Sequence, residues 1–194
     1  SERDLGKGDS FNPQRSQSAF TYWGAFRYTD PETGENRDAT LLIDSLADWM
    51  GFPELRKESA RLYKKFQPDT FLVENKAAGI SLIQDFARAG IYISPFNPMK
   101  MDKLERLMLA VPYIQEGNIF FIDNIQNRNT IAQLCSYPKC KLNDRVDSAS
   151  QALLFLLRMG LNYLPEDEEE EEDENERFSQ MNTIDTSSRL PWSY

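Results

Sequence analysis

The sequence of 194 residues contains no histidine and only two cysteines, Cys135 and Cys140. The absence of histidine excludes a histidine-ligated zinc site and a Ser-His-Asp catalytic triad. Two cysteines are too few for a disulfide scaffold, and we expect both to be reduced thiols. The longest apolar run, residues 152–157, is too short to cross a bilayer, and no signal-peptide pattern opens the chain. Any catalysis must therefore use carboxylates, lysines, hydroxyls or a bound metal.

The net charge of -9 is carried by the end of the chain. Residues 165–194 hold eleven acidic residues against two arginines, whereas residues 1–164 hold 20 acidic and 20 basic residues. Ten of the eleven residues at 166–176 are acidic, and such a segment cannot bury enough apolar surface to offset its ordering entropy. We therefore expect a folded, neutral domain over residues 1–164 and a disordered acidic tail over residues 165–194. The neutral domain neither requires nor excludes a polyanionic partner.

The pattern of apolar residues predicts an α/β fold. Two strand-like segments flank the turn sequence DPETG and predict a β-hairpin, and apolar runs then alternate with helical periodicities. We expect strands at 18–28, 40–45, 69–74, 91–94 and 118–122, and helices at 53–66, 81–89, 102–111, 127–136 and from 144 onward. A hairpin followed by alternating strands and helices indicates a mixed central sheet flanked by helices.

The segment FLVENKAAG places a carboxylate, Glu74, at the end of a predicted buried strand. A turn containing Gly79 then leads into a helix. Carboxyl ends of strands are where α/β folds place ligand sites, so Glu74 is a candidate ligand residue. The alternative is a solvated acid at a strand end.

A second candidate is the segment NDRVDSA at the start of the last predicted helix. Asp144 and Asp147 are three residues apart, so both can lie on one helical face. Acidic residues in a first turn complement the helix dipole, and Asn or Asp is a preferred N-cap. This pair can therefore cap the helix, bind a divalent cation, or do both.

The predicted helix at 102–111 carries Lys103 and Arg106 on one face near its N-terminus, a pattern typical of a phosphate-contacting edge. We expect Leu104, Leu107 and Met108 to point toward the core. The alternative is a solvated amphipathic helix with local ion pairs.

Three segments, in this order, resemble the nuclease domain of the large terminase subunit of tailed bacteriophages, a ribonuclease H-like nuclease. FLVENKAAGISLIQDFARAG resembles that family's acidic strand end, glycine and following helix. MKMDKLERLMLAVPYIQEGNIFF resembles its Asp-Lys-x-x-Arg helix, and LNDRVDSASQALLFLL resembles its Asp-Asp-x-x-Asp-Ala ending. The resemblance covers about residues 18–160. It implies a ribonuclease H-like fold and an endonuclease that cuts concatemeric viral double-stranded DNA during genome packaging.

Carried over by position, the resemblance implies that Glu74 and Asp144 are catalytic, metal-binding carboxylates. It also implies Asp147 as an additional ligand. The implied cofactor is a pair of divalent cations, Mg²⁺ or Mn²⁺, whose oxygen ligands need no histidine. The implied reaction is hydrolysis of a phosphodiester.

The sequence departs from the family pattern at two places. The family's paired aspartates correspond to Asn143 and Asp144, so the first of the pair brings no charge. The family's first carboxylate should end an apolar strand before residue 18, and residues 1–17 contain no such strand. Either that strand lies upstream of this chain, or Asp4 supplies the carboxylate.

The resemblance also implies partners. Lys103, Arg106 and Lys76 would hold the DNA backbone, in contacts that carry no sequence information. The chain lacks a G-x-x-x-x-G-K-[ST] phosphate loop, so the packaging ATPase would be a separate N-terminal domain. The portal protein and the small terminase subunit would be further partners, with no membrane, in the cytoplasm of an infected host.

Other functions fit parts of the sequence. Another ribonuclease H-like enzyme, such as a junction resolvase or transposase, is the alternative nuclease, and a non-catalytic docking module of a packaging motor is the alternative outside enzymes. The acidic tail can compete with DNA for the domain, can solubilise it, or can dock on the portal through residues 190–194 (LPWSY).

Overall fold

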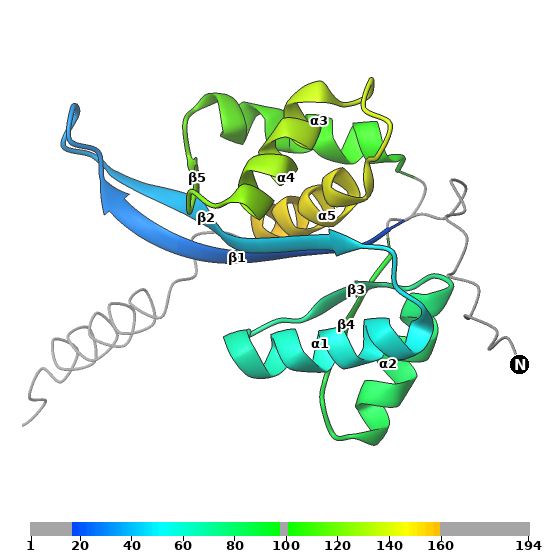
Figure 1. Cartoon of the computed structure of the whole chain (residues 1–194). Helices are drawn as coiled ribbons and strands as arrows, with labels where there is room; N and C mark the ends of the chain where they lie inside the picture. The colour runs from blue at the N-terminus through cyan, green and yellow to red at the C-terminus, as the bar shows by residue number, and fades with distance from the viewer. Residues whose placement is uncertain (1–16, 98–100, 160–194) are drawn as a thin grey trace, which may run out of the picture.

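The computed structural model describes residues 17–97 and 101–159. The expected domain boundary near residue 164, the acidic tail and Asp4 lie outside these residues. The elements, in chain order, are β1 (Ser18–Thr29), β2 (Asn36–Asp48), α1 (Phe52–Phe66), β3 (Leu72–Glu74), α2 (Ala78–Arg88), β4 (Ser94–Phe96), α3 (Lys103–Gln115), β5 (Ile119–Phe121), α4 (Ile125–Ser136) and α5 (Asp144–Met159). They confirm the predicted α/β class, with a mixed sheet flanked by helices (Figure 1).

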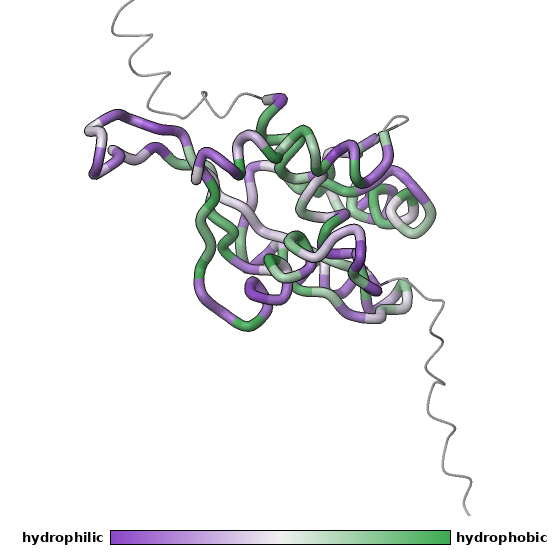
Figure 2. The backbone as a smooth tube through the Cα atoms, turned by 90° about the horizontal axis from the view of Figure 1, so that it is seen from above, coloured by the Kyte–Doolittle hydropathy of each residue, from purple (hydrophilic) through white to green (hydrophobic). Residues whose placement is uncertain are grey.

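The predicted hairpin is present and longer than expected. β1 and β2 pair antiparallel from Ser18↔Asp48 to Thr29↔Asn36. In the turn between them, the carboxylate of Asp30 accepts hydrogen bonds from two backbone N–H groups, as Asp does in tight turns. Figure 2 shows that the tip of this hairpin is hydrophilic. β5 then joins β2 in parallel, which makes this sheet mixed.

The five strands form two sheets, where the sequence predicts one central sheet. One has the order β1-β2-β5, and the other is a parallel pair of β3 and β4. Among the described residues, no strand lies between β1 and β3 to join the two sheets. We call β1, β2, β5, α3, α4 and α5 the larger half, and α1, β3, α2 and β4 the smaller half.

The hairpin separates helices that cover its two faces. Directly paired residues point to the same face of the sheet, so Thr21 and Ser45 share one face while Tyr22 and Asp44 share the other. A bulge at Ile43 shifts the register beyond these pairs. The Thr21 hydroxyl is hydrogen-bonded to that of Ser148 in α5 (3.0 Å).

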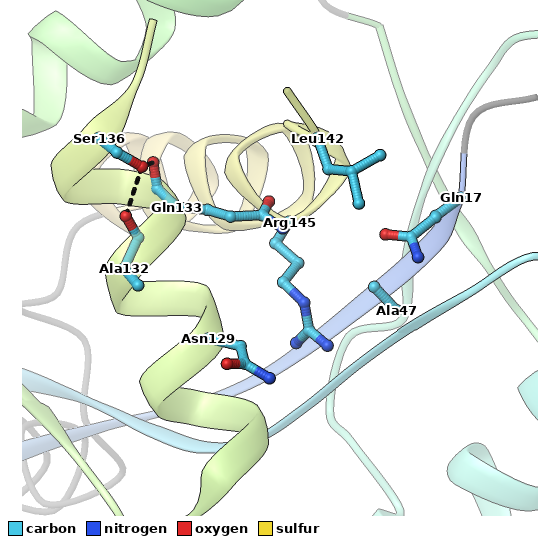
Figure 3. A pocket seen from close by; sticks show the side chains of 8 residues that line it. All are labelled: Gln17, Ala47, Asn129, Ala132, Gln133, Ser136, Leu142 and Arg145. Atoms are coloured by element: carbon cyan, nitrogen blue, oxygen red, sulfur yellow. Dashed lines mark hydrogen bonds between the residues drawn. The ribbon is translucent and has the colours of Figure 1, made fainter. Parts of the chain in front are cut away.

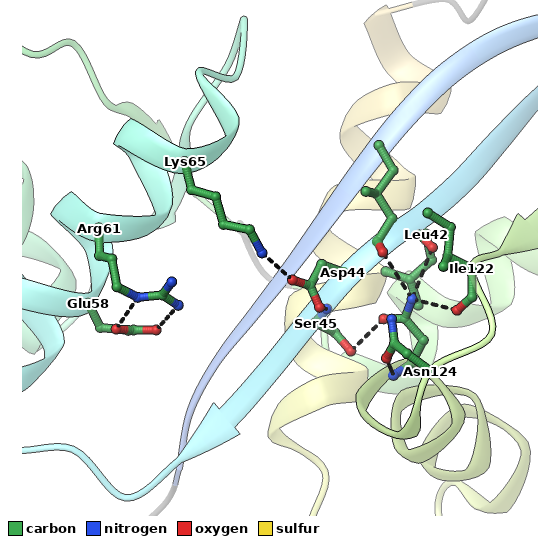
Figure 4. Close-up of polar contacts among 10 residues, drawn as sticks. Leu42, Asp44, Ser45, Glu58, Arg61, Lys65, Ile122 and Asn124 are labelled. Atoms are coloured by element: carbon green, nitrogen blue, oxygen red, sulfur yellow. Dashed lines mark hydrogen bonds and ion pairs between the residues drawn. The ribbon is translucent and has the colours of Figure 1, made fainter.

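On the opposite face, α1 contacts the hairpin with its last turn. The ring of Tyr22 stacks on Phe66 at a centroid distance of 4.1 Å. Lys65 Nζ lies 2.9 Å from a carboxylate oxygen of Asp44 (Figure 4). These contacts connect the smaller half to the larger one.

Each half has its own apolar core. In the larger half, the fully buried residues include Leu42 of β2 together with Val146 and Leu153 of α5. In the smaller half, Leu82, Phe86 and Ile93 form a buried cluster, with aromatic and aliphatic side chains packed around it. In the described part of the chain, no helix is long and apolar enough to span a membrane.

Candidate active site

Several of the predicted site residues lie at element ends on one side of the molecule. Figure 1 shows β3 ending there at Glu74, and β1, α3 and α5 beginning there. The residues at the two helix starts are Lys103 and Asp144. Chain topology alone therefore brings charged groups from three separate sequence segments to one end of the fold.

Glu74 is the last residue of β3, and its position depends on the tight turn that follows. A Cβ atom on Gly79 would lie 2.1 Å from the Glu74 carbonyl oxygen, so glycine is required at that position. Ala77 in the same turn has φ 43°, a backbone conformation that costs free energy for a residue with a side chain. Lys76 Nζ lies 3.0 Å from Glu74 Oε1. The predicted glycine turn is confirmed, with a steric reason.

The starts of α3 and α5 are joined by a group of charged and polar side chains. Lys103 Nζ donates to Asn143 Oδ1 (2.9 Å) and forms an ion pair with Asp147 Oδ2 (3.2 Å). Arg106 donates to Asp147 Oδ1 and to the Met101 carbonyl. Both carboxylate oxygens of Asp147 therefore have cationic partners.

The orientation of α3 differs from the prediction. Leu107 is buried as expected, but Leu104 is 36% exposed and Met108 is 57% exposed, whereas Arg106 is only 4% exposed. The expectation that Leu104 and Met108 point toward the core is wrong. The reason is that the ion pair with Asp147 draws Arg106 into the contact between α3 and α5. We infer that Arg106 positions Asp147.

Asp144, at the start of α5, is hydrogen-bonded to the residue that precedes β1. Its Oδ2 accepts a hydrogen bond from the backbone N–H of Gln17 (3.1 Å). Its other carboxylate oxygen has no hydrogen-bond or ion-pair partner among residues 17–97 and 101–159, and the same holds for Oε2 of Glu74. Of the predicted site carboxylates in the described residues, Asp144 and Glu74 therefore each keep one oxygen available to a cation, whereas Asp147 keeps none.

The available donors match Mg²⁺ or Mn²⁺ in kind, because both ions prefer carboxylate oxygens. Their number is smaller than a full carboxylate set. Within the described ranges, no three His, Cys, Asp or Glu residues gather in a group able to hold a metal. The strand beside β3 is β4, whose residues Ser94, Pro95 and Phe96 include no acid. Asp4 lies outside the described residues.

The burial of Arg145 was not predicted from the sequence. Arg145 is buried within the larger half and hydrogen-bonds Ser45 of β2 and Thr130 of α4. The signal was present in the spacing, because Arg145 stands four and eight residues before Ala149 and Leu153, which are buried on the same face of α5.

The comparisons with known proteins are sparse. No family model matches the sequence, and no curated protein matches it. Among solved structures, the chain is similar to the yeast mitochondrial Holliday junction resolvase Ydc2, with a TM-score of 0.36 and 12% sequence identity, over 74% of this chain and 81% of that one. A similarity at this level does not define a shared fold or a shared activity.

Proposed function

We propose that this chain is a metal-dependent DNA endonuclease of the ribonuclease H-like kind. The observation that supports the proposal is the gathering of Glu74, Lys103, Asp144 and Asp147 at one end of the fold, from the three segments that resemble terminase motifs. Carboxylates and lysines at such an end are the groups that phosphodiester hydrolysis requires in a chain without histidine.

Each residue has a proposed role at this site. Bound divalent cations would activate a water molecule and neutralise charge on the phosphodiester. Glu74 and Asp144 would hold them through the oxygens that lack other partners. Lys103, which is partly exposed beside Asp147, and Lys76, which is exposed and forms an ion pair with Glu74, would contact backbone phosphates.

More specifically, we propose the nuclease domain of a large terminase subunit. Its substrate would be concatemeric viral double-stranded DNA in the host cytoplasm. The nuclease domain would span residues 1–164, followed by the acidic tail at 165–194. A packaging ATPase domain, the portal protein and the small terminase subunit would be its partners.

Plasmid nicking tests the nuclease proposal. The full chain is incubated with supercoiled plasmid in Mn²⁺, Mg²⁺ or EDTA, together with Glu74→Gln and Asp144→Asn. Glu32→Gln is the matched control, because Glu32 lies in the hairpin turn at the far end of the fold. We expect nicking that needs the cation and falls about 100-fold in both site variants, which is a loss of about 2.7 kcal/mol of transition-state stabilisation. Equal nicking by the parent and both site variants would contradict the assignment.

The substrate separates the two nuclease alternatives. A terminase nuclease should cut linear duplex and plasmid with little base preference. A junction resolvase should cleave a four-way junction in preference to a linear duplex of the same sequence.

A non-catalytic docking module is the second candidate, and the engagement of both Asp147 oxygens by Lys103 and Arg106 favours it. Such a module would not depend on a metal. Millimolar Mn²⁺ would then leave the melting temperature unchanged, whereas cation binding between Glu74 and Asp144 should raise it by mass action. A rise in the parent that is absent in Glu74→Gln supports the nuclease.

A further inference from the structure

A pocket of about 360 Å³ lies between α4, the start of α5 and the end of β2, on the face of the hairpin that α4 and α5 cover. Its polar lining residues are Gln17, Asn129, Gln133, Ser136 and Arg145 (Figure 3). Among the described residues that line it, Arg145 alone is charged. We call it the Arg145 pocket. The residues proposed above to bind the cations, Glu74 and Asp144, do not line it, and neither do the proposed DNA contacts, Lys103 and Lys76.

The charge of Arg145 has no anionic partner in the described part of the chain. Its Nη1 donates to Ser45 Oγ (3.3 Å), Thr130 Oγ1 (3.0 Å) and the Gln126 carbonyl (3.1 Å), and its Nη2 donates to the side-chain oxygen of Gln126. All four acceptors are neutral. The side chain is nevertheless only 5% exposed, and burial lowers the pKa of this guanidinium. A buried cation without an anion is costly, so an anion in the pocket would stabilise it.

Within the described residues, the Nε donor of this guanidinium is still unpaired. Nε of Arg145 donates to no acceptor among residues 17–97 and 101–159 and, unlike Nε of Arg106, it is not sealed by protein. Nη2 carries a second hydrogen besides the one it gives to Gln126, and the edge formed by Nε and Nη2 is the one that pairs with two oxygens of an oxyanion. Elsewhere in this protein, Arg61 uses that edge on Glu58, and Arg128 uses it on Asp123.

A second lining residue also lacks a partner. Oε1 of Gln133 is buried with no hydrogen-bond donor in the described residues. Its Nε2 donates to no acceptor in the described residues and, unlike Oε1, is not sealed by protein, so Nε2 is the donor that Gln133 offers to the pocket. Asn129 adds a further side-chain donor from the same helix, whereas the Ser136 hydroxyl already donates to the Ala132 carbonyl.

We propose that the Arg145 pocket binds a phosphate group, with the Nε–Nη2 edge of Arg145 on two of its oxygens and α4 side chains on the others. Donors that come from two helices suit a tetrahedral phosphate, which presents oxygens in several directions, better than a planar carboxylate. The phosphate can belong to a free ion or to the backbone of DNA. In either case none of the proposed metal ligands lines the pocket, although its lining residue Gln17 donates its backbone N–H to Asp144.

The test is a titration of the full chain in EDTA, where no metal-dependent cleavage occurs. Sodium orthophosphate is compared with sodium chloride and sodium acetate at equal ionic strength, by calorimetry and by thermal unfolding. We expect orthophosphate to bind and to raise the melting temperature, and acetate and chloride to do neither. Arg145→Gln should weaken binding about tenfold or more, as loss of a charge-assisted contact does.

Two further variants keep the test decisive. Gln133→Leu alters the pocket wall without removing any hydrogen bond of Arg145, so it decides the outcome if Arg145→Gln does not fold. Arg128→Gln removes an exposed arginine of the same helix and should bind phosphate as the parent does. Equal binding of acetate, no orthophosphate binding by the parent, or parent-like binding by both Arg145→Gln and Gln133→Leu would overturn the proposal.

A competition experiment identifies the source of the phosphate. If orthophosphate displaces a fluorescent DNA duplex from the parent, and less so from Gln133→Leu, the pocket takes a backbone phosphate. If orthophosphate binds without displacing the duplex, the pocket takes the free ion. Both outcomes are compatible with a failure of the nuclease proposal, because neither measurement depends on cleavage.

Discussion

The larger and smaller halves of this protein are stabilised in different ways. The larger half buries polar residues together with apolar ones, and Asn127, Thr130 and Ser45 form a connected, hydrogen-bonded group beneath its helices. In the smaller half, rings pack edge to face and in stacks around a small apolar cluster, with Phe71 between Tyr63 and Phe86. A buried polar group specifies one arrangement because each lost partner is costly, whereas apolar packing tolerates more variation.

This difference bears directly on the candidate active site. Asp144, Asp147 and Lys103 belong to the larger half, whereas Glu74 belongs to the smaller half. The distance between the two sets of charges therefore depends on how the halves are held together, in part through Tyr22 of the hairpin and the end of α1.

The largest expected effect comes from breaking the buried polar group. Nδ2 of Asn127 donates to the carbonyls of Leu42, Ile43 and Ile122, and its Oδ1 accepts from Ser45 (Figure 4). Asn127→Leu removes all four hydrogen bonds at a fully buried position, although the Leu42 carbonyl keeps the Ile122 N–H and the Ser45 hydroxyl keeps Thr130, so we expect a loss of about 3 kcal/mol or more in the free energy of unfolding. Urea unfolding measures it.

The matched control for that change is Asn129→Leu, two residues along the same helix at an exposed position. It should alter the free energy of unfolding by no more than about 0.5 kcal/mol. A similar loss in both variants would mean that the polar group contributes nothing specific.

A smaller effect, confined to one half, is expected from Leu82→Ala. Leu82 is 2% exposed at the centre of the smaller core, and its truncation should cost about 2–3 kcal/mol. Hydrogen exchange should rise in α2 and β3 while α4 and α5 stay protected, because the two halves have separate cores. Equal loss of protection in both halves would show that they unfold as one unit.

The strained turn after Glu74 gives a change of opposite sign. Ala77→Gly should stabilise the protein by about 1 kcal/mol, because glycine adopts the observed positive φ more readily than alanine. Gly79→Ala, two residues later, should instead destabilise it by steric overlap with the Glu74 carbonyl. Thermal unfolding of the two variants compares them, and stabilisation by Gly79→Ala would contradict this account of the turn.

The smallest effect appears only at alkaline pH. Burial between α3 and β2 raises the pKa of Tyr113 to about 12, from an ordinary value near 10. The folded pKa is the higher one, so this contribution to stability is complete below pH 10 and is lost as the pH rises through about 12. Tyr113→Phe should remove that alkaline loss, and unfolding measured from pH 9 to 12 tests it. The exposed variant Tyr92→Phe should behave as the parent does.

The elements governed by local patterns could be predicted from the sequence. The hairpin, the start of α5 and the glycine turn after Glu74 depend on turn residues, caps and periodicity that lie within a few positions of one another. Element ends were less predictable. α3 continues through Pro112 to Gln115, and β4 lies at 94–96 instead of 91–94.

What could not be predicted depends on partners distant in the sequence. Apolar periodicity places hydrophobic residues but cannot show that Arg106 becomes buried, because its partner Asp147 stands 41 residues further along the chain. The division into two sheets has the same origin, since β5 pairs with β2 across the whole smaller half. The candidate site residues were assigned through motif order, and their joint role stays a prediction.

The contact between Thr21 and Ser148 spans 127 positions of the chain, so during synthesis the hairpin is complete before α5 can pack on it. The first strand leaves the ribosome long before the helix that covers it has been translated. Until then, one face of the hairpin meets solvent, and the pairing of β2 with β5 also waits for a distant segment. Such late closure slows folding and exposes strands to aggregation. Translation that stops before α5 should therefore yield aggregating fragments rather than a stable smaller protein.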